Sequence, residues 1–160
     1  MKKGTLYVAI VIAALATYFV YQTWFNPSRA VKRRLGQMAG VLSVPENEPE
    51  IGRAVRLARL RGYLAPDVRV HAGEFEFATR DAIVGVLSGL RPPPRGWDIQ
   101  FVDVQVSVDS KSAAHAGLMI EINTEDAQTG EWRAEQHEAA VSLEKQNDEW
   151  IVVKGDVKSR

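Results

Sequence analysis

Few residues of this sequence are suited to acid–base or metal chemistry. It contains three histidines, His71, His115 and His137, and no cysteine. The histidines show neither an HxxxH nor an HxH spacing, so a histidine-rich metal centre would need all three to converge from separate segments. The lack of cysteine removes thiolate metal sites, iron–sulfur clusters, disulfides and cysteine nucleophiles. We therefore expect no metal site and no cofactor.

Glu135 and His137 are the one pair placed for general acid–base chemistry inside a domain. They share strand parity with Ala139, Val141 and Leu143, which form an apolar face. The pair comes near the start of this predicted strand, at an open rim where its groups keep water, rather than in the buried surroundings that a general base needs. We expect at most ligand binding from Glu135 and His137, and no enzymatic activity.

Another group of residues follows the opposite parity on the preceding predicted strand. His115, Met119 and Glu121 alternate there with apolar residues such as Leu118 and Ile120. Their side chains should therefore point away from the interior. We predict that His115, Met119 and Glu121 contribute to a surface that contacts a partner.

The elements that must position these residues change their period near Gly96. Before it, apolar residues recur with helical spacing over Ser28–Leu42 and Glu50–Tyr63, and Thr79 can cap a third helix. Val68–His71 alternates as a short strand between the second and third helices.

After Gly96 the period is two, which predicts long strands. The four predicted strands are Asp98–Asp109, Ala113–Thr124, Glu131–Lys145 and Trp150–Val157. The last two are joined by a polar four-residue loop, Gln146–Glu149. In the first strand we expect the inward residues to be Val102, Val104, Val106 and Val108. The inner wall of the sheet should then be aliphatic, with no carboxylate.

The N-terminal segment is long enough to cross a bilayer as a helix. No charged residue occurs from Gly4 to Ser28, and an apolar helix of about 20 residues crosses the hydrocarbon core. We predict a transmembrane helix over Thr5–Phe25. The alternative is a cleaved signal peptide, but the apolar run continues past its possible cleavage site at Ala14–Ala16. The Met-Lys-Lys start favours a cytoplasmic N-terminus and an extracytoplasmic domain, whereas the four basic residues after the segment, between Arg29 and Arg34, argue for the reverse orientation.

Two features flank or line this segment. Ala9, Ala13 and Thr17 recur every fourth residue, which would let another membrane helix approach closely, although alanine is also simply common in such helices. Basic residues follow the segment at Arg29, Lys32, Arg33 and Arg34. They indicate either contact with anionic lipid headgroups or an ordinary solvated helix face.

The overall charge disfavours nucleic acid as a partner. Lys plus Arg and Asp plus Glu each number 20, so the net charge is zero. Neutralising a phosphate backbone would require a basic excess.

The order of the predicted elements resembles the nuclear transport factor two-like superfamily, which includes SnoaL-like and ketosteroid isomerase-like proteins. The resemblance covers about residues 30–158 and is carried by "YLAPDVRVHAG", by the capped helix "TRDAIVGVLSGL" and by the final hairpin "NDEWIVVKGDV". It implies a cone in which a curved sheet wraps around helices and whose mouth can hold a small apolar ligand. Members include enzymes, binding modules and structural subunits, so the resemblance does not select a function.

Together these observations predict an α+β protein: a transmembrane anchor in residues 1–27, then a cone-like domain in residues 28–160 with three helices on a curved, mainly antiparallel sheet. The expected function is a non-catalytic accessory or assembly subunit of a larger membrane protein complex, with membrane lipid and other integral membrane proteins as partners. A binding module for a lipid or small apolar ligand is the alternative, followed by a SnoaL-like isomerase or cyclase.

Overall fold

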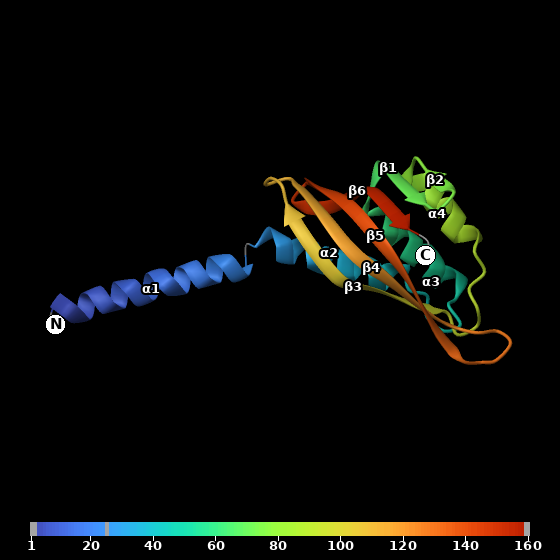
Figure 1. The fold of residues 1–160 in the computed structure, drawn as a ribbon, viewed down its shortest axis with the longest axis horizontal. Coiled ribbons are helices and arrows are strands. Elements are labelled where there is room, and N and C mark those ends of the chain that lie inside the picture. Colours follow the sequence, from blue (N-terminus) through green and yellow to red (C-terminus); the bar gives the residue numbers. More distant parts are fainter. Residues whose placement is uncertain (1–2, 25, 159–160) are drawn as a thin grey trace.

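The computed structural model describes residues 3–24 and 26–158, with side chains for residues 7–21 and 26–158. One helix, α1, extends away from an α+β domain (Figure 1). The helices are α1 (Lys3–Trp24), α2 (Pro27–Leu42), α3 (Glu50–Arg61) and α4 (Arg80–Gly89). The strands are β1 (Leu64–Ala72), β2 (Phe75–Phe77), β3 (Trp97–Val108), β4 (Ala113–Glu125), β5 (Trp132–Gln146) and β6 (Glu149–Lys158).

The strands form one curved sheet in the order β2-β1-β6-β5-β4-β3. Only β1 and β6 pair in parallel, and the other neighbours are antiparallel. Helices α2, α3 and α4 lie on one side of this sheet (Figure 1). The predicted α+β class with a mainly antiparallel sheet is therefore confirmed.

Helix α2 packs on the sheet through the apolar stripe that its sequence predicts. The sequence places Val31, Leu35, Met38 and Leu42 on this stripe; Val31 and Leu35 are buried, at 0% and 1% exposure, and Met38 and Leu42 are half-buried. Ala39, which the pattern did not include, is buried as well, at 4% exposure. The helix begins where Pro27 occupies its first turn and the Asn26 side chain accepts a hydrogen bond from the Ser28 backbone N–H at 3.0 Å. The rotation of α2 about its own axis therefore turns its polar side chains toward the outside of the domain.

The loop between α2 and α3 is fixed by a charge pair and by the sheet. Glu48, whose side chain is 3% exposed, accepts hydrogen bonds from Arg56 Nε at 2.6 Å and Nη2 at 3.2 Å. Val44 and Trp97 exchange backbone hydrogen bonds of 2.9 and 3.1 Å. The adjacent Gly96 has φ +68°, and a Cβ there would lie 1.9 Å from the Val44 carbonyl oxygen. Glycine is required at that position.

The strand after α3 is longer than its sequence pattern predicts, and it has a partner that the pattern missed. β1 starts at Leu64, four residues before the predicted Val68, because its first residues are buried against the core rather than alternating. β2 has three residues, too few for a periodicity. A turn at Gly73, with φ +60°, brings Phe75 opposite Ala72.

Strand β3 contains a bulge that corrects the predicted inner face. Asp103 has φ +52°, and the pairing shifts between Val102 opposite Met119 and Gln105 opposite Gly117. One extra residue lies in β3 at this point, which reverses the parity of the strand.

The reversal divides the four predicted inward valines. Val104 and Val106 do pack against the core, and Val108 lies beside buried Ala114 but is 37% exposed. Val102 faces the other way, opposite Met119, so that prediction is wrong. Ile99 and Phe101 point inward in its place.

The β5–β6 hairpin turns more tightly than the predicted four-residue loop. Gln146 and Glu149 still pair, so only Asn147 and Asp148 form the turn. Both have positive φ, +50° and +63°, as a two-residue type I′ turn requires. Asn and Asp adopt this conformation more readily than other non-glycine residues.

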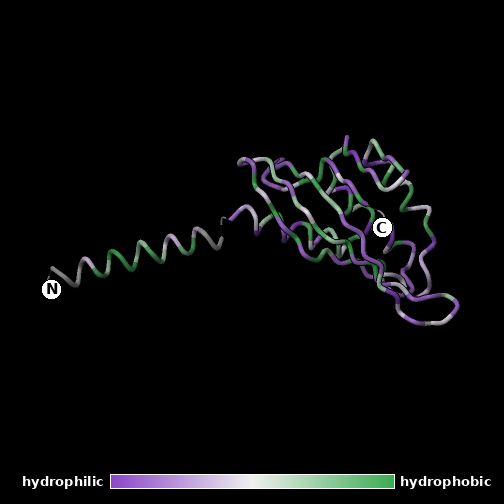
Figure 2. Tube along the Cα trace, in the orientation of Figure 1, coloured by the Kyte–Doolittle hydropathy of each residue, from purple (hydrophilic) through white to green (hydrophobic). Residues whose placement is uncertain are grey.

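Helix α1 carries apolar side chains on all sides. Its larger hydrophobic residues from Tyr7 to Tyr21 are 53–72% exposed, and Figure 2 shows its apolar length against the mixed pattern of the domain. Within the described residues, no helix is both long and apolar enough to cross a membrane. Thr5 and Phe25, the ends of the predicted span, lie outside the residues with described side chains. The transmembrane anchor therefore stays a prediction.

Candidate functional site

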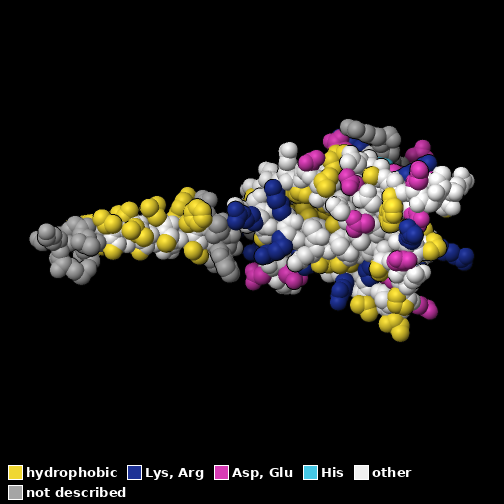
Figure 3. All heavy atoms as spheres, turned by 90° about the horizontal axis from the view of Figure 1, so that it is seen from below, with side chains coloured by type: hydrophobic (Ala, Val, Ile, Leu, Met, Phe, Trp, Pro, Cys, Tyr) yellow, Lys and Arg dark blue, Asp and Glu magenta, His cyan; other side chains and the backbone are white. Residues whose placement is uncertain are grey.

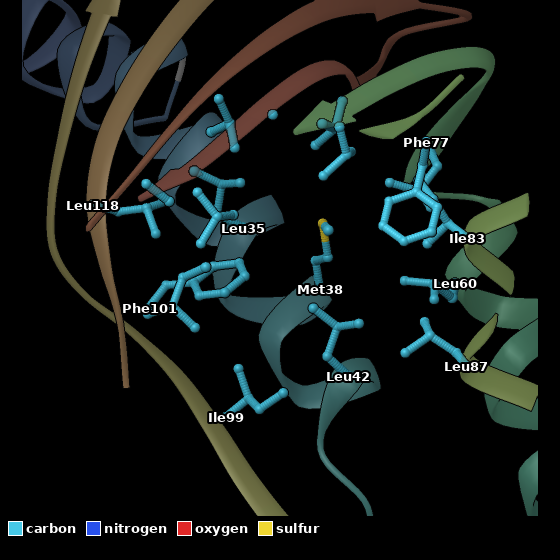
Figure 4. Close-up of a pocket in the computed structure, with 18 of the residues that line it drawn as sticks. Leu35, Met38, Leu42, Leu60, Phe77, Ile83, Leu87, Ile99, Phe101 and Leu118 are labelled. Atoms are coloured by element: carbon cyan, nitrogen blue, oxygen red, sulfur yellow. The ribbon is translucent and has the colours of Figure 1, made fainter. Parts of the chain in front are cut away.

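An apolar cavity lies between the helices and the inner face of the sheet. Its volume is about 290 Å³, and Figure 4 shows Met38 projecting into it between Phe101 on β3 and Ile83 on α4. The lining residues come from every element of the domain except α1: Leu35, Met38, Leu42, Leu60, Leu64, Val70, Phe77, Ile83, Leu87, Ile99, Phe101, Leu118, Ile120, Ile122, Ala139, Val141, Val152, Gly155 and Val157.

Local sequence explains why space remains here. Two small residues, Ala139 and Gly155, lie on neighbouring strands of the inner wall. A side chain on Gly155 would meet Val70 at 3.4 Å, an ordinary van der Waals contact, so the missing Cβ leaves room rather than avoiding a clash. A bulge in β6 at Val153 aligns both Val152 and Gly155 with the cavity.

The size and lining of the cavity define what it can bind. An engineered cavity of about 150 Å³ lined by similar residues stays dry and accepts benzene, whereas pockets for drug-sized ligands begin at about 300 Å³. At about 290 Å³, this cavity suits a small apolar molecule such as a fused aromatic ring system or a short acyl chain.

The cavity wall offers no group for acid–base or nucleophilic catalysis. All the residues that line it have hydrocarbon or thioether side chains, apart from Gly155. General acid–base catalysis needs a titratable group within hydrogen-bonding reach of the substrate. The aliphatic inner wall expected from the sequence is thus present, with Ile99 and Phe101 in place of Val102.

Glu135 and His137 are close together but outside the cavity lining. The His137 Nε2 to Glu135 Oε2 distance is 3.8 Å, and the side chains are 29% and 66% exposed. His137 pairs with Ile120 on β4, which does line the cavity, so the pair lies at the rim. Ligand binding by Glu135 and His137 stays a prediction.

His115 lies on the outer face of the sheet, as its parity predicts, and bridges two polar residues. Its Nε2 is 2.9 Å from Asp109 Oδ2, and its Nδ1 is 3.0 Å from Ser142 Oγ. The sequence pattern missed this chain of contacts because only the β4–β5 register places His115 opposite Ser142.

The Ser142, His115 and Asp109 contacts have the residue types of a serine hydrolase, which would need a further feature. Acyl transfer needs hydrogen-bond donors aimed at the developing oxyanion. Strand β5 pairs with β4 and β6, and its register with β6 shifts between Ser142 and Leu143. The three residues form a polar network on the outer face of the sheet.

Glu121 and Met119 share this outer face. Glu121 accepts hydrogen bonds from Gln136 Nε2 at 2.9 Å and Asn123 Nδ2 at 3.2 Å, and these bonds hold the pKa of the Glu121 carboxyl below its ordinary value. Met119 is half-buried opposite Glu138. The predicted partner surface of His115, Met119 and Glu121 is thus outward-facing, while its role as an interface is untested.

One other predicted site can be located, the small-residue face of α1. Ala9, Ala13 and Thr17 lie exposed along one face of α1, and the Thr17 hydroxyl donates to the Ala13 carbonyl at 2.7 Å. Among the described residues, no three His, Asp or Glu side chains are grouped so as to hold a metal ion.

Comparison with known proteins identifies the fold. The chain matches no protein-family model and no curated protein sequence. Among solved structures, the association domain of C. elegans CaMKII aligns with a TM-score of 0.69 at 11% identity, over 86% of this chain and 99% of that one. A scytalone dehydratase-like protein from Novosphingobium aromaticivorans aligns with a TM-score of 0.69 at 14% identity, over 85% of each chain. An NTF2-like protein with a cystatin-like fold from the same organism has a TM-score of 0.66 at 12% identity, over 88% of this chain and 87% of that one.

The domain has an NTF2-like fold. The expectation drawn from the "YLAPDVRVHAG" segment and the final hairpin is therefore confirmed at the level of fold. Identities of 11–14% carry no function with them, and these NTF2-like neighbours comprise an association domain as well as an enzyme-like protein. The function of this chain must be argued from its own surfaces.

Proposed function

We propose that the chain is a non-catalytic, membrane-anchored accessory or assembly subunit of a larger membrane protein complex. Helix α1 would be the single-pass anchor and would contact other integral membrane proteins. The NTF2-like domain would lie on the extracytoplasmic side and contact a partner through the outer face of its sheet.

The exposed apolar surface of α1 carries this proposal. Ile10, Val11 and Ile12 are 56%, 55% and 61% exposed, and as successive residues they point about 100° apart around the helix. A helix that is apolar all round is stable when something outside it covers every side, as a bilayer does. The run without charge from Gly4 to Ser28 supports the same environment.

The non-catalytic part of the proposal rests on the cavity. No titratable group lines it, and Glu135 and His137 lie at its rim. The polar network at His115 lies on the outer face of the sheet, away from the cavity. The domain therefore offers surfaces for contact rather than a reaction centre.

Membrane extraction tests the anchor. The full-length protein should remain in the membrane fraction after alkaline carbonate treatment, and its intact mass should show the complete N-terminus, give or take Met1. Release by carbonate, or a mass lacking about the first 16 residues at the Ala14–Ala16 site, would contradict the anchor.

A matched pair of substitutions tests assembly. Ala13→Leu places a bulky side chain in the face of Ala9 and Thr17, so it should weaken co-purification of the membrane partners. Ala14→Leu adds the same volume about 100° around the helix and should not. Equal behaviour of the two variants would argue against helix packing through that face.

The apolar cavity supports a second candidate function, the binding of a small apolar molecule or acyl chain. Native mass spectrometry of the protein purified in detergent without partners should then show an added small-molecule mass. Ala139→Leu, which fills the inner wall, should abolish that mass. Protein that carries no bound small molecule would contradict this second function, and the accessory role would remain as the proposal.

A further inference from the structure

Four basic residues follow the N-terminal helix, and the structure divides them into two kinds. Arg34 is turned inward: its Nε donates to the Trp150 carbonyl at 3.1 Å and its Nη2 donates to the Gly62 carbonyl at 2.7 Å. Its guanidinium carbon lies 4.0 Å from the centre of the Tyr63 ring. Arg34 therefore joins α2 to the domain and is not available to an outside partner.

The other three point outward. Arg29, Lys32 and Arg33 are exposed, and their side chains make no hydrogen bond or ion pair with any other described residue. Arg29 lies three and four residues before Lys32 and Arg33, which places the three on one side of α2, roughly a third of a turn from the buried stripe at Leu35. Figure 3 shows Lys and Arg side chains gathered where α1 meets the domain.

The charge on α2 is confined to the end that follows α1. Residues 27–33 span about 9 Å at 1.5 Å per residue, which is close to the screening length at physiological ionic strength. Further along the same side, Gly36 and Gly40 are exposed but uncharged, and α2 contains no acidic residue. A charge pattern that fades with distance from an apolar helix matches a lipid surface better than an extended polymer.

We infer that Arg29, Lys32 and Arg33 form a basic face that binds anionic lipid headgroups of the bilayer into which α1 inserts. This inference rests on the proposed membrane anchor and deepens it by naming the lipid chemistry beside the anchor. The headgroup phosphates would supply the counter-charges that the described residues do not. Arg34 has a different role because carbonyl oxygens of the domain already occupy it.

A single fluorescent label can report this contact. The chain has no cysteine, so Gly36→Cys gives one labelling site, and a Cβ at Gly36 would meet no atom within 4 Å. The labelled full-length protein is reconstituted in two kinds of vesicle, phosphatidylcholine alone and equimolar phosphatidylcholine–phosphatidylglycerol. The readout is quenching by lipids that carry a spin label on the headgroup.

We expect stronger quenching in the anionic vesicles, and loss of the difference at high salt. The variant R29Q/K32Q/R33Q should behave alike in both vesicles. Since each cation near an anionic surface favours the bound state about fivefold, the three together should shift this equilibrium on the order of a hundredfold. The control R59Q/R69Q/R91Q removes the same charge from exposed positions elsewhere and should retain the lipid dependence.

The outcomes separate this inference from the anchor itself. Protein that floats with neither vesicle type would refute the proposed anchor. Protein that floats with both, but whose label is quenched equally in both, would refute the basic face as a lipid site and point to an acidic partner protein instead. Loss of the difference in the control variant would also overturn it, because net charge would then be the cause.

Discussion

Helices α1 and α2 follow one another in the chain, but they place their apolar side chains in opposite ways. α2 buries Val31, Leu35 and Ala39 against its own domain and presents polar residues to the outside. α1 presents apolar side chains on every side, with Leu15 62% exposed. The free energy that holds α2 in place therefore comes from within the chain, whereas α1 depends on its surroundings.

The largest effect expected from this difference is at Leu35. Leu35→Ala should lower the free energy of unfolding of the domain by about 3 kcal/mol, because Leu35 is 1% exposed and its removal leaves a cavity. Leu15→Ala should change it by less than about 0.5 kcal/mol, since Leu15 packs on nothing in the domain. Chemical denaturation in detergent, followed by near-ultraviolet circular dichroism, measures both. Comparable losses would show that α1 is part of the folded unit.

The sequence correctly predicts which face of α2 points inward, and Leu35 lies on that face. The apolar residues of this helix recur with the period of an α-helix, so they gather on one face, and that face packs against the sheet. The inner face of β3 was harder, because the bulge at Asp103 interrupts an unbroken alternation of valines. No glycine marks the left-handed conformation there. The parity error at Val102 follows directly from this.

The candidate site likewise has features that the sequence predicts and contacts that it does not. Its apolar wall follows from alternation within each strand, as Leu118 and Val141 illustrate. Contacts between strands depend on register, which alternation does not specify. This is why the link from Ser142 through His115 to Asp109 was not predicted, although the outward direction of His115 was.

A smaller effect is expected at the far end of α2, where a buried charge fixes the loop to α3. Glu48→Gln should destabilise the domain by about 2 kcal/mol, because it leaves the Arg56 guanidinium, 13% exposed, without its counter-charge. Glu46→Gln is the control at an exposed position nearby. Thermal denaturation of the two variants gives the comparison. Similar midpoints would mean that the pair contributes no more than a surface ion pair.

The rim of the cavity should tolerate change even better. Exchange of both Glu135 and His137 for Gln should alter the free energy of unfolding by less than about 0.5 kcal/mol, since the two side chains are 3.8 Å apart and are 66% and 29% exposed. Association with membrane partners should also be retained, as measured by co-purification. Loss of function in this variant, together with a silent Ala13→Leu, would favour an enzyme over an accessory subunit.

The smallest expected effect concerns Glu121 on the outer face, where α1 and the core play no part. The hydrogen bond from Gln136, and then that from Asn123, stabilises the carboxylate and lowers the pKa of Glu121 in the folded state. A lowered pKa contributes stability above the ordinary value, and this contribution is lost as pH falls through the folded-state pKa. Gln136→Ala should therefore raise the Glu121 pKa, and carbon-13 NMR of the side-chain carboxyl gives the midpoint. Gln105→Ala, an exposed change on the same face, should leave it in place. A midpoint unmoved by Gln136→Ala would mean that Asn123 alone sets the charge of this surface.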